Sequence, residues 1–223
     1  MLSFEDVTLS YKKKIILQQA SFTAAPGTMN AFLGINGSGK STLLSAAAGI
    51  LTPAGGTISY NGISSLDRKA YRPNFGFVTQ EDALMPELSP LDNLRLWTPL
   101  KKKEILAAIA EPPLVMLGIT PLLDIPIRHM SGGMKKRLAL ASVLINKPKV
   151  LLLDEPFTAL DMMAREDIMQ YLGLFMQEGG TILIASHEKE TFYRASNVWL
   201  LKDKTLQPVP PASDPAALLR STL

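Results

Sequence analysis

The chain has 223 residues, of which 47% are hydrophobic, and its formal net charge is +3. This length suits one sizeable domain, and no apolar run approaches the roughly 18–20 residues that span a bilayer, so we expect a soluble chain without a membrane span. The sequence has no cysteine, which excludes a disulfide framework and a thiolate metal site, and the acidic, alternating start "MLSFEDVTLS" is unlike a signal peptide.

The positive charges gather in three short clusters: Lys12–Lys14, Lys101–Lys103 and Lys135–Arg137. We interpret the first two as solvated faces, and the third as cations that either serve a dimer or meet solvent. No basic stripe is interleaved with aromatic residues, as a site for single-stranded nucleic acid would require. We therefore expect no nucleic-acid partner.

The first quarter of the chain predicts strands around one glycine-rich loop. The segments "SFEDVTLSY" and "IILQQASFTA", within residues 2–25, alternate as an antiparallel pair would. "TMNAFLG" is a short apolar strand that enters the loop, and "KSTLLSAAAG" is a helix that ends at Gly49. "GGTISYNG" then predicts a strand with an Asn-Gly turn at 61–62, and "FGFVTQ" predicts a buried strand over 75–80.

The composition changes between residues 81 and 148, where short helical patterns are separated by prolines. We expect an inserted helical subdomain there, ending with a helix after Ser131. The runs "KVLLLDEP" and "TILIAS" that follow are continuously apolar, as in strands buried on both faces of a parallel sheet. A helix over about 163–178 would form the crossover between them. The sequence thus predicts an α/β fold.

The strongest functional pattern is "GINGSGKS", Gly34 to Ser41, which fits the phosphate-loop pattern between a strand and a helix. Backbone N–H groups of such a loop surround phosphates, the Lys40 ammonium neutralises their oxygens and the Ser41 hydroxyl ligates Mg²⁺. We expect Thr42 to contact the phosphates too. The pattern therefore predicts a site for the β- and γ-phosphates of a nucleotide together with Mg²⁺.

Two adjacent carboxylates, Asp154 and Glu155, follow the strand "VLLL". Open α/β sheets bind ligands at the carboxyl ends of their strands. We predict that Asp154 holds the metal, directly or through water, and that Glu155 acts on the attacking water as general base.

A second anion-binding arrangement occurs in "RHMSGGMKKRLALA", residues 128–141, where a Ser-Gly-Gly turn precedes a helix. Helix amino termini present unpaired N–H groups and partial positive charge. We call Ser131–Gly133 the signature turn. Judged by residue pattern alone, this turn is a second site for the kind of phosphate ligand that the phosphate loop already binds.

Together these motifs, in this order, resemble the nucleotide-binding subunits of ATP-binding-cassette (ABC) transporters over about residues 2–206. In that resemblance Gln80 is the Q-loop glutamine, "ALD" (159–161) the D-loop and His187 in "IASHE" the switch histidine. Tyr11 stands where the family has an aromatic residue that stacks on adenine, whereas His129 matches no family role. The resemblance implies a P-loop NTPase with a RecA-like parallel-sheet core, an N-terminal antiparallel β subdomain and an inserted α-helical subdomain.

The resemblance also implies that the cofactors are ATP and Mg²⁺, and it implies the site residues and the domain limits. The ATPase domain would span residues 1–207, with the helical subdomain at about 81–148 and a tail at 208–223. The predicted catalytic residues are Glu155, His187 and Gln80, and those predicted to hold Mg²⁺ are Ser41, Gln80 and Asp154. The residues predicted to contact ATP are Tyr11, Gly34, Ile35, Asn36, Gly37, Ser38, Gly39, Lys40, Ser41, Thr42, Ser131, Gly132, Gly133 and Asp161.

The partners implied are a separate transmembrane permease subunit and a second copy of this chain or a homologous ATPase subunit. The signature turn of one copy would contact the γ-phosphate held by the other, and Asp161 would communicate across the dimer. The chain would be cytoplasmic and peripheral on the membrane through its permease. Met134, where the family usually has glutamine, and the short stretch after Gln207 favour the exporter branch. The alternatives are a soluble ABC-family ATPase of DNA repair or translation and, ranked lower, a phosphoryl-transfer kinase that shares only the phosphate loop.

Overall fold

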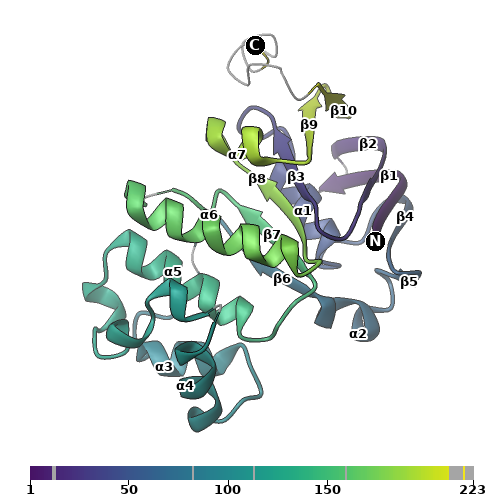
Figure 1. Ribbon diagram of the computed structural model, residues 1–223. Coiled ribbons are helices and arrows are strands. Elements are labelled where there is room, and N and C mark those ends of the chain that lie inside the picture. Colours follow the sequence, from purple (N-terminus) through teal and green to yellow (C-terminus); the bar gives the residue numbers. More distant parts are fainter. Residues whose placement is uncertain (12–13, 82, 113, 159, 211–217, 219–223) are drawn as a thin grey trace.

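The computed structural model describes residues 1–11, 14–81, 83–112, 114–158, 160–210 and 218. Lys12, Lys13, Ala159 of the predicted D-loop and most of the predicted tail therefore lie outside the described residues. Figure 1 shows three parts: an antiparallel sheet beside a larger parallel sheet, and helices gathered at one end. Among the described residues, no helix has both the length and the apolar character needed to cross a membrane.

The smaller sheet has the strand order β2-β1-β4-β5, with every neighbouring pair antiparallel. Its strands are β1 (Leu2–Tyr11), β2 (Lys14–Ala24), β4 (Gly55–Tyr60) and β5 (Ile63–Ser64). Asn61 and Gly62 both have positive φ, at 48° and 79°, and form the predicted turn between β4 and β5. The predicted antiparallel pairing of the first two strands is confirmed.

The larger sheet has the order β10-β9-β3-β8-β7-β6. Its strands are β3 (Met29–Leu33), β6 (Phe75–Val78), β7 (Val150–Asp154), β8 (Thr181–Ala185), β9 (Asn197–Lys202) and β10 (Thr205–Val209). All pairs are parallel except β9 with β10, which are antiparallel. The predicted α/β fold with a parallel core and an antiparallel sheet is confirmed.

The helices cover this sheet and build the inserted segment. They are α1 (Lys40–Ala47), α2 (Arg68–Tyr71), α3 (Pro90–Leu96), α4 (Lys102–Ala110), α5 (Gly132–Leu144), α6 (Met162–Gln177) and α7 (Lys189–Arg194), with 3₁₀ turns η1 (Arg72–Asn74), η2 (Leu114–Leu117), η3 (Thr120–Leu122) and η4 (Ile127–His129). Figure 1 places α3, α4 and α5 together at the end of the molecule away from the small sheet. The predicted crossover helix is α6.

The two long helices begin at the capping residues that their sequences provide. The Ser131 hydroxyl accepts a hydrogen bond from the Met134 N–H at 3.2 Å, and a carboxylate oxygen of Asp161 accepts one from the Ala164 N–H at 2.8 Å. Such caps satisfy helix N–H groups that would otherwise lack partners, at about 1 kcal/mol each. Gly49, with φ 67°, follows α1 in the left-handed conformation expected of a helix end.

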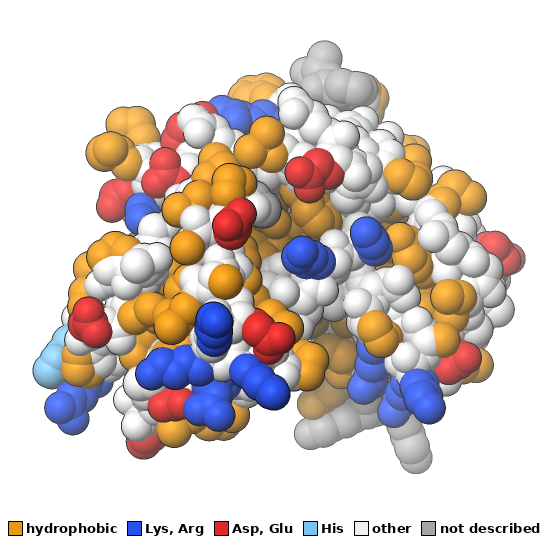
Figure 2. Space-filling model, turned by 60° about the horizontal axis from the view of Figure 1, so that its bottom comes forward, with side chains coloured by type: hydrophobic (Ala, Val, Ile, Leu, Met, Phe, Trp, Pro, Cys, Tyr) orange, Lys and Arg blue, Asp and Glu red, His pale blue; other side chains and the backbone are white. Residues whose placement is uncertain are grey.

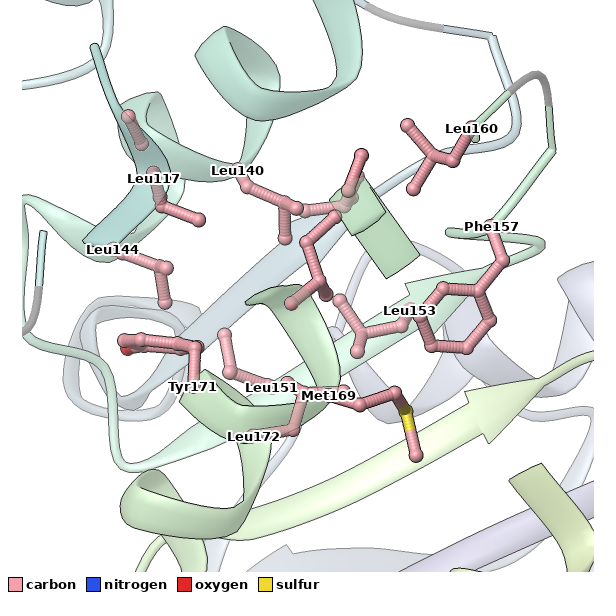
Figure 3. Close-up of a cluster of buried hydrophobic side chains, with 14 of the residues drawn as sticks. Leu117, Leu140, Leu144, Leu151, Leu153, Phe157, Leu160, Met169, Tyr171 and Leu172 are labelled. Carbon is pink, nitrogen blue, oxygen red and sulfur yellow. The ribbon is translucent and has the colours of Figure 1, made fainter. Parts of the chain in front are cut away.

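The parallel sheet separates two hydrophobic clusters, and β7 contributes to both. Val150 and Leu152 pack with α1 and the small sheet, whereas Leu151 and Leu153 pack with α5 and α6. Alternation of this kind follows from the two-residue period of a strand, and it explains why the run is apolar at every position. Figure 3 shows the second cluster, with Leu117, Leu140, Leu144, Leu151, Leu153, Phe157, Leu160, Met169, Tyr171 and Leu172 labelled.

The sequence did not predict β9 and β10, and the turn between them shows why. Asp203 and Lys204 both have positive φ, at 49° and 63°, in a position where hairpins usually carry Asn-Gly or Asp-Gly. Pro208 lies within β10, which is tolerated because this strand is at the edge of the sheet. Strand β10 thus extends two residues past the predicted domain end at 207. At the opposite edge, β6 ends at Val78, before the predicted end at residue 80.

The cationic clusters differ in their surroundings. Lys101–Lys103 are exposed, as predicted, and Figure 2 shows Lys and Arg side chains along the lower edge of the face that carries the helical subdomain, among acidic and hydrophobic side chains. The interpretation of Lys135–Arg137 as cations that serve a dimer or meet solvent is wrong for Lys136, which is buried, whereas the Arg137 side chain is 27% exposed and its part of the interpretation stays a prediction. Lys136 is only 3% exposed, and an Arg137 guanidinium nitrogen lies 3.5 Å from a carboxylate oxygen of Asp167 on α6.

Candidate active site

A cavity of about 470 Å³ lies where β3, β7 and β8 end. Its lining residues are Ile16, Asn36, Gly37, Gly39, Lys40, Ser41, Thr42, Gln80, Asp154, Glu155, Thr158 and His187. They come from the loop after β3 and the start of α1, from the segments after β6, β7 and β8, and from β2. Because these strands are parallel, their carboxyl ends bring together four segments that are far apart in the sequence.

The loop between β3 and α1 requires glycine at particular positions. A Cβ on Gly34 would lie 2.4 Å from Ser38 Oγ, and a Cβ on Gly39 would lie 2.5 Å from Ile16 Cγ2. Gly37 and Gly39 also have positive φ, at 79° and 113°. Without these side chains a ligand can approach the loop backbone closely.

Lys40 is buried at the start of α1 and points its ammonium at the loop. It is 7% exposed, and its Nζ donates hydrogen bonds to the carbonyl oxygens of Gly34, at 2.7 Å, and Ile35, at 3.3 Å. Burial lowers the pKa of Lys40, and the carboxylates of Glu155 and Asp154 oppose that shift. No side chain caps the amino terminus of α1, so the first N–H groups of this helix add to the positive potential beside Lys40.

The two carboxylates at the end of β7 have different surroundings. Asp154 is 4% exposed and pairs with Ala185 of β8. The Glu155 N–H donates to the Ala185 carbonyl oxygen at 2.9 Å, and Glu155 has φ 47°, a left-handed conformation that is uncommon for a residue with a side chain. Burial raises the pKa of Glu155; Lys40 opposes this shift and Asp154 adds to it. The site therefore holds a carboxylate with increased affinity for a proton.

His187, in the segment after β8, lies beside this carboxylate. Its Nε2 is 3.0 Å from Glu155 Oε1. Burial lowers the pKa of His187 below its usual 6.5, the Lys40 charge adds to that shift, and Glu188 opposes it. The imidazole is therefore mostly neutral at pH 7.

The polar atoms of the site fit a phosphate ligand with a hard cation. Ser38 Oγ is buried, and no hydrogen bond from the described residues reaches it, while the buried Glu155 Oε1 has His187 Nε2 beside it at 3.0 Å. Buried polar atoms normally have partners, so such atoms point to a ligand or to a catalytic role. Ser41, Gln80 and Asp154 bring hydroxyl, amide and carboxylate oxygens to the same cavity, and these are the ligand types that Mg²⁺ prefers together with phosphate oxygens.

Not every predicted site residue lines this cavity. Tyr11 ends β1, is 60% exposed and is not among the lining residues, whereas Ile16 of β2 is. The signature turn and Asp161 stand at the starts of α5 and α6, also outside the lining. Ser131 and Asp161 are exposed. The signature turn thus lies apart from the cavity of its own chain.

Sequence reasoning missed two lining residues, Ile16 and Thr158. Ile16 belongs to the run "IIL", in which three consecutive apolar residues break the alternation of β2. In a strand with one buried face, such a run places at least one apolar side chain away from the core. That break was the available signal. Thr158 follows "DEPF", where no pattern singles it out.

Comparison with known proteins gives consistent results for sequence and structure. A family model described as ABC transporter matches residues 17–158. The chain is 38% identical over 194 residues to the Nod factor export ATP-binding protein I of Rhizobium meliloti, covering 85% of this chain and 57% of that protein. It is 35% identical over 193 residues to a spermidine/putrescine import ATP-binding protein of Mesoplasma florum, covering 85% and 55%.

A third relative, a lantibiotic transport ATP-binding protein of Streptococcus pyogenes, is 33% identical over 187 residues, covering 84% of this chain and 80% of the relative. The chain thus spans little more than half the length of the first two of these relatives and most of the length of the third. Among solved structures, a dimeric ATP-binding cassette in a post-hydrolysis state with ADP and Pi superposes with a TM-score of 0.83 at 25% identity, covering 96% of this chain and all of that chain.

Proposed function

The chain belongs to the ABC transporter family, and from this premise we propose that it binds and hydrolyses ATP to power a separate membrane-spanning subunit. One observation carries the proposal. A single cavity brings the phosphate loop together with Gln80, Asp154, Glu155 and His187, residues that come from four distant segments of the chain. This is the set that ATP hydrolysis needs: a phosphate cradle, metal ligands and a base.

Phosphate binding is the first step, and several residues of the cavity would share it. The loop N–H groups and the Lys40 ammonium would hold the phosphates, because both present positive charge to the same cavity. Ser41, Gln80 and Asp154 would hold Mg²⁺. A bound Mg²⁺ would offset the negative charge of the phosphate oxygens.

Activation of water is the second task, and it falls to Glu155. Its raised pKa makes this carboxylate a better proton acceptor than an exposed glutamate. Glu155 would take one proton from the attacking water while the water oxygen bonds to the γ-phosphorus and the bond to the ADP oxygen breaks. His187, mostly neutral and 3.0 Å from Glu155, would orient the γ-phosphate by a hydrogen bond.

A second copy of this chain would complete the site. The signature turn is outside its own cavity, Ser131 is exposed, and its hydroxyl caps a helix whose first N–H groups can hold an anion. Asp161 has the same kind of position at the start of α6. We infer that Ser131–Gly133 of one copy bind the γ-phosphate held by the other, as the dimeric state of the similar cassette supports.

The transmembrane partner would bind beside the Gln80 loop. A small cavity of about 60 Å³ there is lined by residues of β6, the Gln80 loop and α5 together with Trp97, which is 48% exposed. Leu96 and Met85, 48% and 50% exposed, extend the apolar surface of the helical subdomain. Binding here would hold the chain on the cytoplasmic face of a membrane. Met134 and the Nod factor export relatives favour export of a small molecule, drug or peptide.

The experiment that tests the proposal compares hydrolysis by the wild-type chain, Glu155→Gln and a control, His129→Gln. Replacement of the base should reduce turnover by about 10²–10⁴-fold while ATP still binds. His129 is exposed in η4 and is not among the residues that line the cavity, so its variant should retain the wild-type rate. Unchanged turnover in Glu155→Gln would remove this residue from its role as base.

The transport assignment needs a separate measurement. Purification of the chain from its native cells in mild detergent should recover an integral membrane protein with it. Recovery of ribosomes or DNA in its place would favour an ATPase of translation or DNA repair.

A further inference from the structure

Lys136 is a buried cation that contacts the backbone of the Gln80 loop. It lies in the second turn of α5 and is 3% exposed. Its Nζ donates hydrogen bonds to the carbonyl oxygens of Thr79, at 3.4 Å, and Gln80, at 3.3 Å. Strand β6 ends at Val78, so these carbonyls follow the last residue of the ladder with β7. A side chain of α5 therefore holds the backbone that leads into the active-site cavity.

Helix α5 and strand β6 also touch at a second point. A Cβ on Gly76 would lie only 2.3 Å from Val143 Cγ1, so the helix approaches the strand closely there. From Lys136 to Val143 the helix advances about 10 Å at 1.5 Å per residue. From Gly76 to the Thr79–Gln80 peptide the strand advances a similar distance, about 12 Å at 3.3 Å per residue. The two elements thus lie side by side and antiparallel, with a contact near each end.

The contact between Lys136 and the Gln80 loop connects two parts of the chain that the proposed ATP hydrolysis uses. Ser131, the cap of α5, is the group offered to the other copy, and Gln80 lines the chain's own cavity. Lys136 lies on α5 five positions after Ser131 and contacts the carbonyl of Gln80 itself. A buried ammonium is costly unless polar atoms compensate it, and the carbonyl oxygens at the end of β6 supply part of that compensation. Any displacement of the start of α5 would therefore move the Gln80 backbone or lose these hydrogen bonds.

We propose that Lys136 is a positioning residue that fixes the Gln80 loop to the signature helix, and so links engagement of Ser131 by the other copy to the placement of Gln80 in the chain's own site. The inference rests on the proposed ATP hydrolysis. It assigns to Lys136 no contact with ATP; its effect passes through Gln80.

The test compares Lys136→Met, which keeps the side-chain length but removes the donor, with Lys136→Arg, which keeps both charge and donors. The matched control is Lys103→Met, an identical change at an exposed position of α4. Lys136→Met should lower kcat roughly tenfold, within the range of coupling between contacting residues. ATP affinity of the separate chain should stay within about twofold because the phosphate loop is untouched. The Mg²⁺ concentration for half-maximal rate should rise, Lys136→Arg should restore much of the rate, and Lys103→Met should behave as wild type.

A double-mutant cycle with Gln80→Ala separates positioning from a general loss of stability. If Lys136 acts through Gln80, then Lys136→Met should have almost no further effect on kcat in the Gln80→Ala chain. Full additivity, or an unchanged Mg²⁺ requirement in Lys136→Met, would overturn the inference. Thermal melting is followed for every variant, and Lys136→Gln replaces Lys136→Met in the cycle if the latter does not fold. An inactive wild-type chain would instead contradict the proposed function.

Discussion

Glu155 shows how burial of a single carboxylate affects both chemistry and stability. Burial raises its pKa in the folded chain, so between the unfolded value, about 4.5, and the folded value the folded state binds more protons than the unfolded state. The free energy of unfolding therefore falls as pH rises through this window, and the cost persists at pH 7. Glu155→Gln removes that cost.

We therefore expect Glu155→Gln to melt at a higher temperature than the wild-type chain at pH 7, with a gain that shrinks as the pH is lowered towards 4.5. Thermal melting in the absence of nucleotide, at several pH values, measures this difference. If the gain in melting temperature instead grew as the pH was lowered, the pH dependence would be opposite to the one expected. Burial would then not dominate the environment of Glu155.

Gly37 and Gly39 allow two kinds of backbone constraint to be separated within one loop. Gly37→Ala adds a methyl group that has no other atom within 4 Å. Its only cost is therefore the positive φ of 79°, which is unfavourable for alanine by about 1–2 kcal/mol. Gly39→Ala meets φ 113° and Ile16 Cγ2 at 2.5 Å. We expect the larger loss of stability at Gly39, measured by denaturant unfolding, and a partial recovery when Ile16→Ala is added. Equal losses at the two positions would contradict the predicted contact.

At the scale of elements, the features that follow local rules could be predicted from the sequence. Ser131 begins α5, and the apolar run before Asp154 forms a strand buried on both faces, because capping and periodicity are local properties. The β9–β10 hairpin could not be predicted because its turn uses Asp203 and Lys204 without a glycine. Which residues share the cavity depends on strand order, which local pattern does not specify; the motif order of the family supplied most of them.

The contact between α5 and β6 also explains why Gly76 is needed in an edge strand. A methyl group there would meet Val143 Cγ1 at 2.3 Å and Pro148 Cγ at 3.0 Å. We expect Gly76→Ala to lose about 1–3 kcal/mol of stability through overpacking. Val143→Ala should be less harmful in the Gly76→Ala chain than in the wild type, because it removes the nearest clash. Denaturant unfolding of both single variants and the double variant measures this coupling, and additive losses would argue against the close approach.

At the scale of the whole molecule, the cavity proposed to be catalytic and the signature turn proposed to bind an anion lie at separate places in the chain. The cavity is lined by Lys40 and Glu155 among others. The signature turn is at the start of α5, and its residues are not among those that line the cavity. A closed two-fold dimer would pair each cavity with the signature turn of the other copy and use both sites twice. In this proposed dimer the fold of each chain supplies both halves, and assembly would complete each site.

Mixing two inactive variants tests this division of labour. Lys40→Ala disables the cavity but leaves the signature turn intact, while Ser131→Arg blocks the signature turn but leaves the cavity and its ATP binding nearly intact. Each variant alone should be unable to hydrolyse ATP.

In an equimolar mixture, half of the dimers would be mixed, and each mixed dimer would contain one complete site: the cavity of the Ser131→Arg chain with the signature turn of the Lys40→Ala chain. With independent sites the mixture should recover up to about a quarter of the wild-type rate. The rate should peak at equal amounts of the two chains, because any excess forms inactive pairs. A mixture no more active than its separate components, or a Ser131→Arg chain that hydrolyses ATP at full rate alone, would show that the signature turn does not complete the site of another copy.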